Sequence, residues 1–450
     1  MKKRLPVLCL LLVFCFLTFS FDSSADTEFQ NPSLPYDISV TFSDDAATEK
    51  NFTWFTGGLD SRRAVVVVRE AGGGPQMIFT GSCEIATGRQ NHYFDQMFFN
   101  NPGNIVQFKV NKVTATGLKP DTKYEYYCGD GTPENWSRTA YFETGPETGG
   151  FTFIFMSDPQ AAADQHFEMW KKCSESALAA FPDAKFAALA GDLVDRGSSE
   201  TQWNKFFSYG AGFLSRLTVA PAIGNHETDN GPGSFDKHFN FPKNDYGLPD
   251  YVYSFDIGNA RFMVLSTEKT FAEFASGDEN IRRQAALFIA SQIDWLKDRV
   301  LTDPKKWNIV MFHKGIYSGG RYAGTNETLS YRNMLAPVFD ELSIDAVLQG
   351  HNHTFDRAFL YEGKTVEGVA AETQAAAKIK GTLYLTANTA GPKFYSESAV
   401  KPAYLLKHAQ PQTQMYTGVT VADNYMKFDT YAVSASGAGA LYDTFTLYKL

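Results

Sequence analysis

The sequence predicts two domains, an all-β sandwich followed by an α/β domain. Short β-rich runs separated by turns occupy residues 34–144, a turn-forming connection follows at 146–150, and strands alternate with helices from residue 151 onward. The 450 residues also exceed the roughly 100–200 residues that one domain usually holds. With 44% apolar and 20% charged residues, the chain has the composition of a globular protein and not of a disordered one.

The first domain is expected over residues 31–147, with strands at the spacing of a β-sandwich. Those strands are predicted at 37–42, 51–55, 63–69 and 139–143. The segment 116–126 resembles the fibronectin type III turn that leads to a corner tyrosine. This resemblance implies that Leu118 plugs the core and that the Tyr124 hydroxyl bonds back to the backbone; a generic hairpin is the alternative.

The second domain is expected over residues 150–450. A first strand, helix and strand are predicted at 151–156, 165–181 and 186–190. A later helix is predicted at 281–301, and later strands at 217–223, 260–266, 307–312, 346–348 and 381–386. Three further strands near the C-terminus, 415–421, 425–431 and 442–450, are expected to complete one sheet of this domain.

Residues 1–25 have the pattern of a secretory signal peptide. A basic start at residues 2–4 precedes a nearly unbroken apolar run at 5–21, and small residues follow at 23–25. A retained anchor helix is the alternative, although a run of about 17 residues is at the short end for crossing a bilayer. The sequence therefore predicts an exported protein, in the periplasm, at the cell surface or released.

The net charge restricts the classes of binding partner, and the cysteine content restricts the number of disulfides. The net charge of −9 argues against a nucleic-acid or anionic-lipid surface, and no second run is apolar enough to cross a membrane. A small anionic substrate would then need a local positive centre, which bound metal can provide. Cleavage after residue 25 would leave Cys83, Cys128 and Cys173, so that one disulfide, Cys83–Cys128, or none is expected.

Residues that commonly bind metal follow directly after five of the predicted strands. In an α/β sheet the carboxyl ends of the strands form the crevice where sites are built, so residues remote in sequence can meet there. Carboxylate, amide and imidazole groups suit divalent and trivalent ions, and a carboxylate can bridge two of them. The candidates are Asp158, Asp192, Asn225, His313, and the pair His351 and His353. Each alone is a weak signal, since an aspartate after a strand more often caps a helix or forms a turn.

The five segments, in this order and spacing, resemble the calcineurin-like metallophosphoesterase superfamily. They are residues 157–160, 191–197, 224–227, 310–313 and 350–353. The resemblance implies a four-layer α/β/β/α sandwich that holds two divalent or trivalent metal ions, with Fe, Zn and Mn as the candidates. It implies that a hydroxide bridging the two ions attacks the phosphorus atom.

The same resemblance assigns the ligands. It places the first ion on Asp158, Asp192 and His353, and the second on Asp192, Asn225, His313 and His351. His226 is then not a ligand, and its implied role is to stabilise the transition state and protonate the leaving oxygen.

With a sandwich in front and a signal peptide, the layout is most similar to purple acid phosphatases and their bacterial relatives. Asp195 stands where those enzymes have a metal-binding tyrosine, so a ferric-tyrosinate centre and its colour are not expected. Segment 191–197 is similar instead to the serine/threonine protein phosphatase branch, which implies that Asp195 orients His226 and that Arg196 binds phosphate. A local ion pair between Asp195 and Arg196 is the alternative. Gln160 stands where many superfamily members have a histidine ligand, and we expect it to bind weakly, through water or not at all.

Other polar and aromatic residues are assigned less specific roles. Tyr317, Arg321 and Tyr322 follow His313 in a Gly-rich loop and are candidates for a pocket wall, with an ordinary loop as the alternative. The remaining histidines lack a comparable context and are expected at the surface or in the core: His92, His166, His238 and His408.

The leading hypothesis is an exported phosphatase that releases phosphate from small phosphate monoesters. A phosphodiesterase or nucleotide hydrolase is the alternative, because the same metal core cleaves both ester classes and the residues that line the pocket determine which one binds. A non-catalytic binding or adhesion protein is the alternative from another class, and retention of the ligands and of His226 argues against it.

Overall fold

The structure, a computed structural model, describes residues 31–60, 63–90, 104–228, 234–366, 374–375, 380–398 and 401–449. The predicted signal peptide at 1–25 and His92 lie outside the described residues. Within this part of the chain, no helix combines the length and the apolar character that crossing a bilayer requires.

The N-terminal domain is an all-β sandwich of seven described strands. The four predicted strands are confirmed, and three more lie between them: β1 (Tyr36–Thr41), β2 (Lys50–Thr56), β3 (Ala64–Glu70), β4 (Met77–Gln90), β5 (Asn104–Ala115), β6 (Lys123–Gly129) and β7 (Ala140–Glu143). The predicted tyrosine corner is also confirmed. Leu118 is only 3% exposed in the sandwich core, and the Tyr124 hydroxyl accepts a hydrogen bond of 2.7 Å from the Lys119 N–H.

The first sheet of the α/β domain has parallel strands at its centre. These are β8 (Phe151–Met156), β9 (Phe186–Leu189) and β10 (Thr218–Pro221). The C-terminal strands extend the sheet beyond β8 in antiparallel order: β20 (Met415–Val421), β21 (Tyr425–Val433) and β22 (Gly439–Tyr448), with the short β17 (Gln374–Ala375) at the edge. The prediction that the C-terminal strands complete one sheet is thus confirmed.

The second sheet also has a parallel centre. Its parallel strands are β12 (Ala260–Val264), β13 (Trp307–Lys314), β14 (Ala346–Gly350) and β18 (Thr382–Thr386). Antiparallel strands flank them: β11 (Tyr253–Ile257), β15 (Phe355–Tyr361), β16 (Lys364–Thr365) and β19 (Lys407–Ala409).

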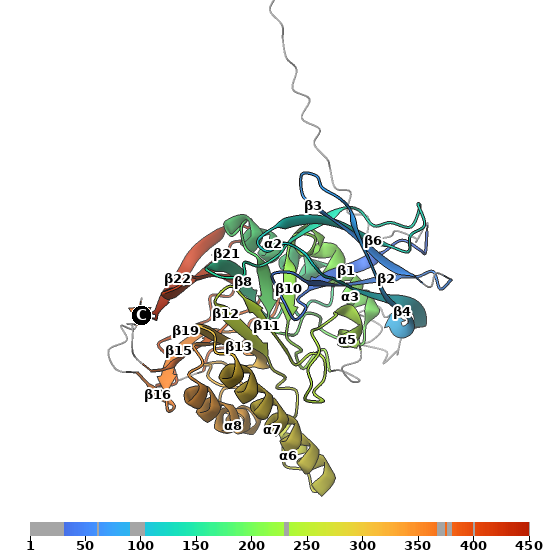
Figure 1. Ribbon diagram of the computed structural model, residues 1–450. Helices are drawn as coiled ribbons and strands as arrows, with labels where there is room; N and C mark the ends of the chain where they lie inside the picture. Colours follow the sequence, from blue (N-terminus) through green and yellow to red (C-terminus); the bar gives the residue numbers. More distant parts are fainter. Residues whose placement is uncertain are drawn as a thin grey trace, which may run out of the picture.

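The two sheets pack face to face, and helices cover their outer faces (Figure 1). Between the sheets, the Phe153 ring meets the Phe262 ring edge-on at 5.1 Å. Outside the first sheet lie α2 (Asp164–Ala180), α3 (Glu200–Tyr209) and α4 (Ala211–Leu214), and the outer helices of the second sheet are α7 (Glu279–Thr302) and α8 (Asn326–Leu342). Two one-turn helices, α5 (Phe235–His238) and α6 (Phe271–Phe274), complete the set that is described. This is the predicted four-layer α/β/β/α arrangement.

The sandwich and the α/β domain share a continuous sheet. Strand β1 pairs in parallel with β10, with Thr41 opposite Val219, so the sheet runs from β22 through β8 into the sandwich. Just after β1, the Phe42 ring stacks on the Phe255 ring at 3.9 Å and is buried in the core of the α/β domain. The sandwich is therefore joined to the first sheet of the α/β domain both by backbone pairing and by buried side chains. The boundary predicted near residue 150 lies between β7 and β8.

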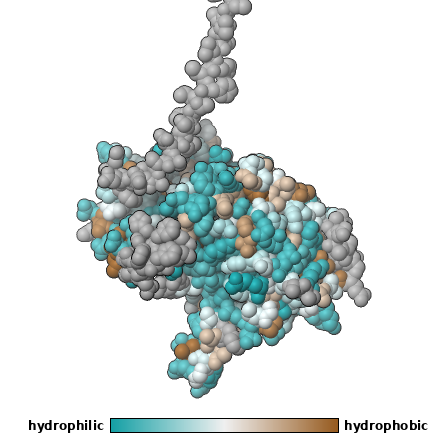
Figure 2. All heavy atoms as spheres, turned by 180° about the vertical axis from the view of Figure 1, so that it is seen from behind, coloured by the Kyte–Doolittle hydropathy of each residue, from teal (hydrophilic) through white to brown (hydrophobic). Residues whose placement is uncertain are grey.

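The surface is predominantly hydrophilic over the face shown in Figure 2, with hydrophobic residues scattered in small groups. The described cysteines, Cys83, Cys128 and Cys173, are not joined in disulfides. Cohesion of this part of the chain therefore comes from its cores and from the shared sheet.

Candidate metal centre

All six predicted metal ligands lie at the carboxyl ends of parallel strands, from both sheets. Asp158, Asp192 and Asn225 follow β8, β9 and β10 of the first sheet. His313 and the pair His351 and His353 come from β13 and β14 of the second sheet. The prediction that every ligand stands in a loop needs one correction. His313 lies inside β13, because that strand runs on to Lys314 past a register shift that follows Met311.

The backbone at this edge is strained. Asp158, Gln160, Asp192, His351 and His353 have φ values of 55°, 35°, 50°, 68° and 47°, in the left-handed region that side chains other than glycine rarely adopt. They make up half of the ten such residues in the part of the chain that is described. Strain of this kind persists where the surrounding structure over-determines it, and it gathers at functional sites.

Glu227 supplies much of that support. Its buried carboxylate accepts the backbone N–H groups of Asp192 and Leu193 at 2.8 Å each, and that of Gly224 at 2.9 Å. It thereby ties the turn after β9 to the turn after β10. Sequence reasoning quoted Glu227 within a motif but gave it no role. A glutamate inside a ligand motif, where burial leaves a charge in need of donors, is the signal that could have identified it.

The first group of ligands is the pair Asp158 and His353. His353 Nε2 lies 3.1 Å from Asp158 Oδ1, while the Nδ1–H group donates to the Lys393 carbonyl oxygen at 2.8 Å. Asp158 Oδ2 accepts the Ser157 hydroxyl at 2.5 Å and the His351 N–H at 3.0 Å. Both side chains are fully buried, so the carboxylate is oriented from several sides.

The second group surrounds His313 Nε2. This atom lies 3.1 Å from Asp192 Oδ2, 3.2 Å from Asn225 Oδ1 and 3.2 Å from His351 Nδ1. Because His313 gives its Nδ1–H to the Ala190 carbonyl oxygen at 2.8 Å, the neutral ring faces these three atoms with a lone pair.

The donor set therefore fits a metal ion. Asp192 Oδ2, Asn225 Oδ1 and His351 Nδ1 each lie within 3.2 Å of His313 Nε2, and the ligand atoms of Asp192, His313 and His351 lie within 4.8 Å of one another. A cation at their centre would satisfy all four. Oxygen and imidazole donors are also the ligand types that Mn, Fe and Zn accept.

The electrostatics agree, because the group attracts positive charge. Burial acts to lower the pKa of His313, but the Asp192 carboxylate outweighs it and raises this pKa to about 10. Burial acts to raise the pKa of Asp192, yet His313 and His226 hold it well below its usual range. Burial and the neighbouring His313 charge lower the pKa of His351. These shifts show that the carboxylates and imidazoles of this group together favour a positive charge among them.

His226 lies beside the second group. Its backbone N–H donates to Asp192 Oδ1 at 2.9 Å, and its half-buried ring places Nε2 3.9 Å from Asp192 Oδ2. Its Nδ1–H donates to the backbone carbonyl oxygen of Asp195 at 2.6 Å, whereas the nearer Asp195 carboxylate oxygen is 3.8 Å from Nδ1. Asp195 thus contacts the ring through its main chain at the shorter distance, and its implied role in orienting His226 stays a prediction.

The Asp195 carboxylate has a different partner, Lys393, whose ammonium lies 2.5 Å from Asp195 Oδ1. Arg196 is exposed, and its backbone N–H donates to the Gln202 side-chain oxygen at 2.8 Å. Lys393 belongs to the loop after β18, which sequence reasoning missed. That loop also carries Thr389, whose hydroxyl donates to the Asp158 carbonyl oxygen at 2.7 Å. The position of this loop directly after the parallel strand β18 is the sequence signal that could have identified it.

Two tyrosines border the ligand histidines. Tyr322 stacks on His351 with ring centroids 4.4 Å apart, and Tyr395 stacks on His353 at 4.2 Å. The Arg321 guanidinium lies over both tyrosine rings, at 4.6 and 4.7 Å from their centroids. Of the three residues predicted to form a pocket wall, Arg321 and Tyr322 therefore lie beside the candidate metal ligands.

Tyr317 and the three described histidines outside the ligand motifs do not join the candidate metal centre. Tyr317 is buried against Tyr384 and Tyr404. His238 is a core residue that stacks on Trp203 and pairs with Glu200, His408 pairs with Asp356, and His166 is half-buried on α2.

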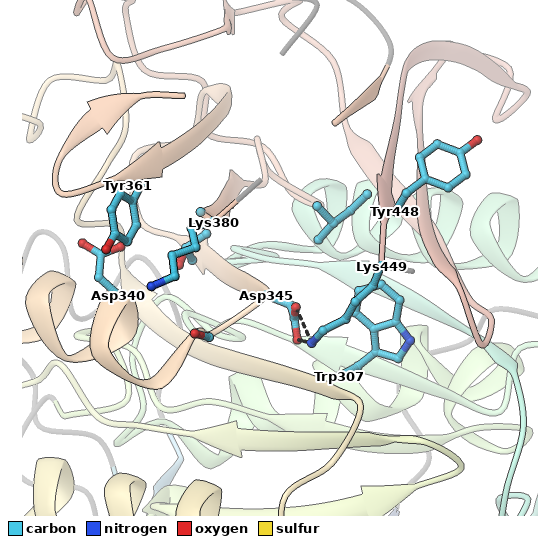
Figure 3. A pocket seen from close by; sticks show the side chains of 11 residues that line it. Trp307, Asp340, Asp345, Tyr361, Lys380, Tyr448 and Lys449 are labelled. Atoms are coloured by element: carbon cyan, nitrogen blue, oxygen red, sulfur yellow. Dashed lines mark hydrogen bonds and ion pairs between the residues drawn. The ribbon is translucent and has the colours of Figure 1, made fainter. Parts of the chain in front are cut away.

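A separate hollow of about 210 Å³ lies at the opposite edge of the second sheet (Figure 3). It is lined at the amino ends of the strands, by Trp307 at the start of β13 and Asp345 just before β14. Lys449 pairs with Asp345 at 2.9 Å inside it. This hollow is therefore distinct from the metal centre, whose ligands gather at the carboxyl ends.

Comparisons with known proteins agree with both halves of the fold. Residues 151–355 match the family model of the calcineurin-like phosphoesterases, and residues 35–144 match that of the purple acid phosphatase N-terminal domain. A purple acid phosphatase from yellow lupin (Lupinus luteus) seeds superimposes with a TM-score of 0.73 at 17% identity, covering 93% of this chain and 75% of that chain. At this identity the likeness shows the fold alone.

Relatives among curated proteins are distant. An uncharacterized protein of Mycobacterium tuberculosis is 23% identical over 427 residues, which cover 85% of this chain and 73% of the relative. Acid phosphatase type 7 of Danio rerio is 24% identical, covering 61% of this chain and 64% of the relative. Probable purple acid phosphatase 20 of Arabidopsis thaliana is 22% identical, covering 55% of each.

The two family matches adjoin along the chain and coincide with the two domains of the structure. The metal-type ligands gather in the domain that matches the phosphoesterase model. We conclude that this chain contains a calcineurin-like phosphoesterase domain and a purple acid phosphatase N-terminal domain in a purple acid phosphatase-like fold, and that it is a hydrolase of the phosphatase class.

Proposed function

We propose that this protein is an exported phosphatase that hydrolyses phosphate monoesters at a dinuclear metal centre. The observation that carries the proposal is the convergence of lone-pair atoms from Asp192, Asn225, His313 and His351 around one point, beside the Asp158–His353 pair. Monoesters are proposed as the substrate class because relatives named acid phosphatase and purple acid phosphatase match this chain.

In this proposal the ligands are shared as the resemblance implied. Asp158 and His353 would hold the first ion, Asn225, His313 and His351 would hold the second, and Asp192 would be shared by both. When bound, the ions would supply positive charge for the phosphoryl oxygens and would lower the pKa of a water. The chain's own residues provide the remaining functions.

His226 is the proposed proton donor. Its Nδ1–H is committed to the Asp195 carbonyl oxygen at 2.6 Å, which fixes the ring and leaves Nε2 to carry the mobile proton. As the bond between phosphorus and the leaving oxygen breaks, that oxygen takes the proton from Nε2 and departs as an alcohol. The exposed Arg196 is proposed to bind the phosphate.

Export is proposed from the basic start and apolar run of residues 1–25. Expression with the native N-terminus, followed by N-terminal sequencing of the protein found outside the cytoplasm, tests it. A mature N-terminus near residue 26 is expected, whereas an intact residue 1 on membrane-held protein supports the retained anchor.

The enzymatic proposal is tested by phosphate release from one monoester and one diester, with each of several divalent metals. Metal-dependent turnover of the monoester is expected, together with its loss in the His226→Ala variant. A faster diester would replace the proposal with a phosphodiesterase. Absence of turnover with any metal, although metal is bound, would support the binding-protein alternative.

A further inference from the structure

The side chain of Gln160 ends at the metal centre with an unused oxygen. The residue is fully buried, and its Oε1 atom has no hydrogen-bond donor among the described residues. Native structures leave few buried polar atoms without a partner, and each exception calls for a water, an ion or a functional reason.

The direction of this amide is fixed by its nitrogen. Gln160 Nε2 contacts His226 Nε2 and lies 3.5 Å from Asp195 Oδ1. Both are acceptors while His226 is neutral, before it takes up the proton that it later donates, because its single N–H is then on Nδ1 and donates to the Asp195 carbonyl oxygen. A reversed amide would set its oxygen against a carboxylate oxygen and a ring lone pair. Oε1 therefore points away from these two residues.

The backbone keeps this amide beside the ligands. The Gln160 N–H donates to the Asp192 carbonyl oxygen at 2.8 Å, and Asp158 lies two residues earlier in the same turn. Both Asp158 and Gln160 have positive φ angles, 55° and 35°. The Gln160 amide contacts His226 Nε2, and this nitrogen lies 3.9 Å from Asp192 Oδ2, so the amide and the shared carboxylate are neighbours of the same ring nitrogen.

A cation is the partner that suits this oxygen. An amide oxygen is a neutral, hard donor of the kind that binds Mg²⁺, Ca²⁺ and Mn²⁺, and it adds no charge to a site that already holds two carboxylates. We propose that Gln160 Oε1 is a ligand of the first ion, completing a set with Asp158, Asp192 and His353. The inference rests on the metal centre of the proposed function.

The two sites then differ in chemistry. The first offers three oxygen donors and one imidazole, whereas the second, on Asp192, Asn225, His313 and His351, offers two oxygens and two imidazoles. Oxygen-rich sites suit Mn²⁺, and imidazole-rich sites suit Zn²⁺. The first site is therefore selective for Mn²⁺ relative to the second.

Metal binding itself tests the inference. The mature full-length protein is stripped with a chelator and titrated with Mn²⁺ alone, and free Mn²⁺ is followed by electron paramagnetic resonance. Wild type is expected to bind two ions, and Gln160→Leu to weaken one of the two sites at least tenfold. Gln292→Leu is the matched control, since Gln292 is equally buried but lies on α7, and its amide bonds to the main chain of Ser266 and not to a proposed ligand. Unchanged Mn²⁺ binding by Gln160→Leu would overturn the proposal.

A second variant keeps the test decisive if Gln160→Leu does not fold. Gln160→His replaces the oxygen with an imidazole and is expected to raise the bound Zn²⁺ to Mn²⁺ ratio at least tenfold after equilibration with both metals. An unchanged ratio overturns the proposal. These readouts do not depend on turnover. A wild type that binds Mn²⁺ through Gln160 but releases no phosphate would sink the proposed function and leave this inference standing.

Discussion

Replacing Glu227 with glutamine is expected to weaken metal binding although Glu227 is not itself a proposed ligand. Glu227 Oε1 accepts the Leu193 N–H at 2.8 Å and the Val194 N–H at 3.3 Å, and Oε2 accepts those of Asp192 and Gly224 at 2.8 and 2.9 Å. An amide keeps one oxygen, so two buried N–H groups would face an NH₂ group. Each buried donor that loses its acceptor costs about 1–3 kcal/mol.

The net loss of stability is expected to be smaller than the sum. Burial and the nearby Asp192 charge raise the pKa of Glu227 to about 8. A neutral amide at this position removes both of these unfavourable effects. We therefore expect Glu227→Gln to lower the free energy of unfolding by about 2–4 kcal/mol, measured at pH 9, where the wild-type carboxylate is ionised. Because Asp192 would lose its main-chain anchor, metal affinity should fall as well.

The assay is guanidinium unfolding of chelator-treated protein, followed by metal titration of the folded variant. Glu200→Gln is the matched control. Glu200 is a buried glutamate bonded to His238 at 3.1 Å near the junction with the sandwich, so its loss should cost stability and spare metal binding. If Glu227→Gln unfolds at the wild-type midpoint and binds metal like wild type, Glu227 does not hold the Asp192 turn.

Three further predictions address the proton donor, the ligand turn and the domain junction. Asp195→Asn should keep kcat within about tenfold of wild type, because the backbone carbonyl oxygen holds His226. His226→Ala should lower kcat by about 10²–10⁴-fold. Equal decreases of kcat in phosphate-release assays would support a role for the Asp195 carboxylate. Gly350→Ala should lose metal, counted by elemental analysis, because the added methyl would lie 2.6 Å from Asp158 Oδ2; full metal content would contradict this contact. Burial, reinforced by the nearby Glu200 charge, raises the pKa of Asp37 to about 8, so the folded state keeps a proton that the unfolded state loses above about pH 4. Asp37 should lower the free energy of unfolding by up to about 1.4 kcal/mol per pH unit between pH 4 and 8, and Asp37→Asn should reduce the measured slope by that amount in denaturant titrations. An unchanged slope would exclude a contribution from Asp37.

Much of the fold follows from local patterns. Buried strands such as 151–156 and the C-terminal run 415–421 are continuous stretches of strand-forming residues, and β8 and β20 have those bounds. Helix α2 was predicted within one residue at each end, because its apolar positions repeat at helical spacing. Strands β4 and β5 were missed, since much of β4 is exposed and gives no alternating pattern.

The identity of the candidate ligands also followed from the sequence alone. Carboxylate, amide and imidazole groups directly after predicted parallel strands must meet at one edge, because parallel strands end on the same side. Asp158, Asp192, Asn225 and the histidines therefore needed no coordinates to be named. Their roles as ligands stay predictions until metal binding is measured.

What only the tertiary structure decided is how the supporting groups pair. Lys393 and Asp195 are 198 positions apart, and the Thr389 hydroxyl reaches the Asp158 carbonyl across 231 positions. No local pattern encodes such contacts, because they depend on how two sheets and several strained turns come together. The choice between the carbonyl and the carboxylate of Asp195 as the partner of His226 rests on a difference of about 1 Å in distance, 2.6 against 3.8 Å, which residue types alone cannot resolve.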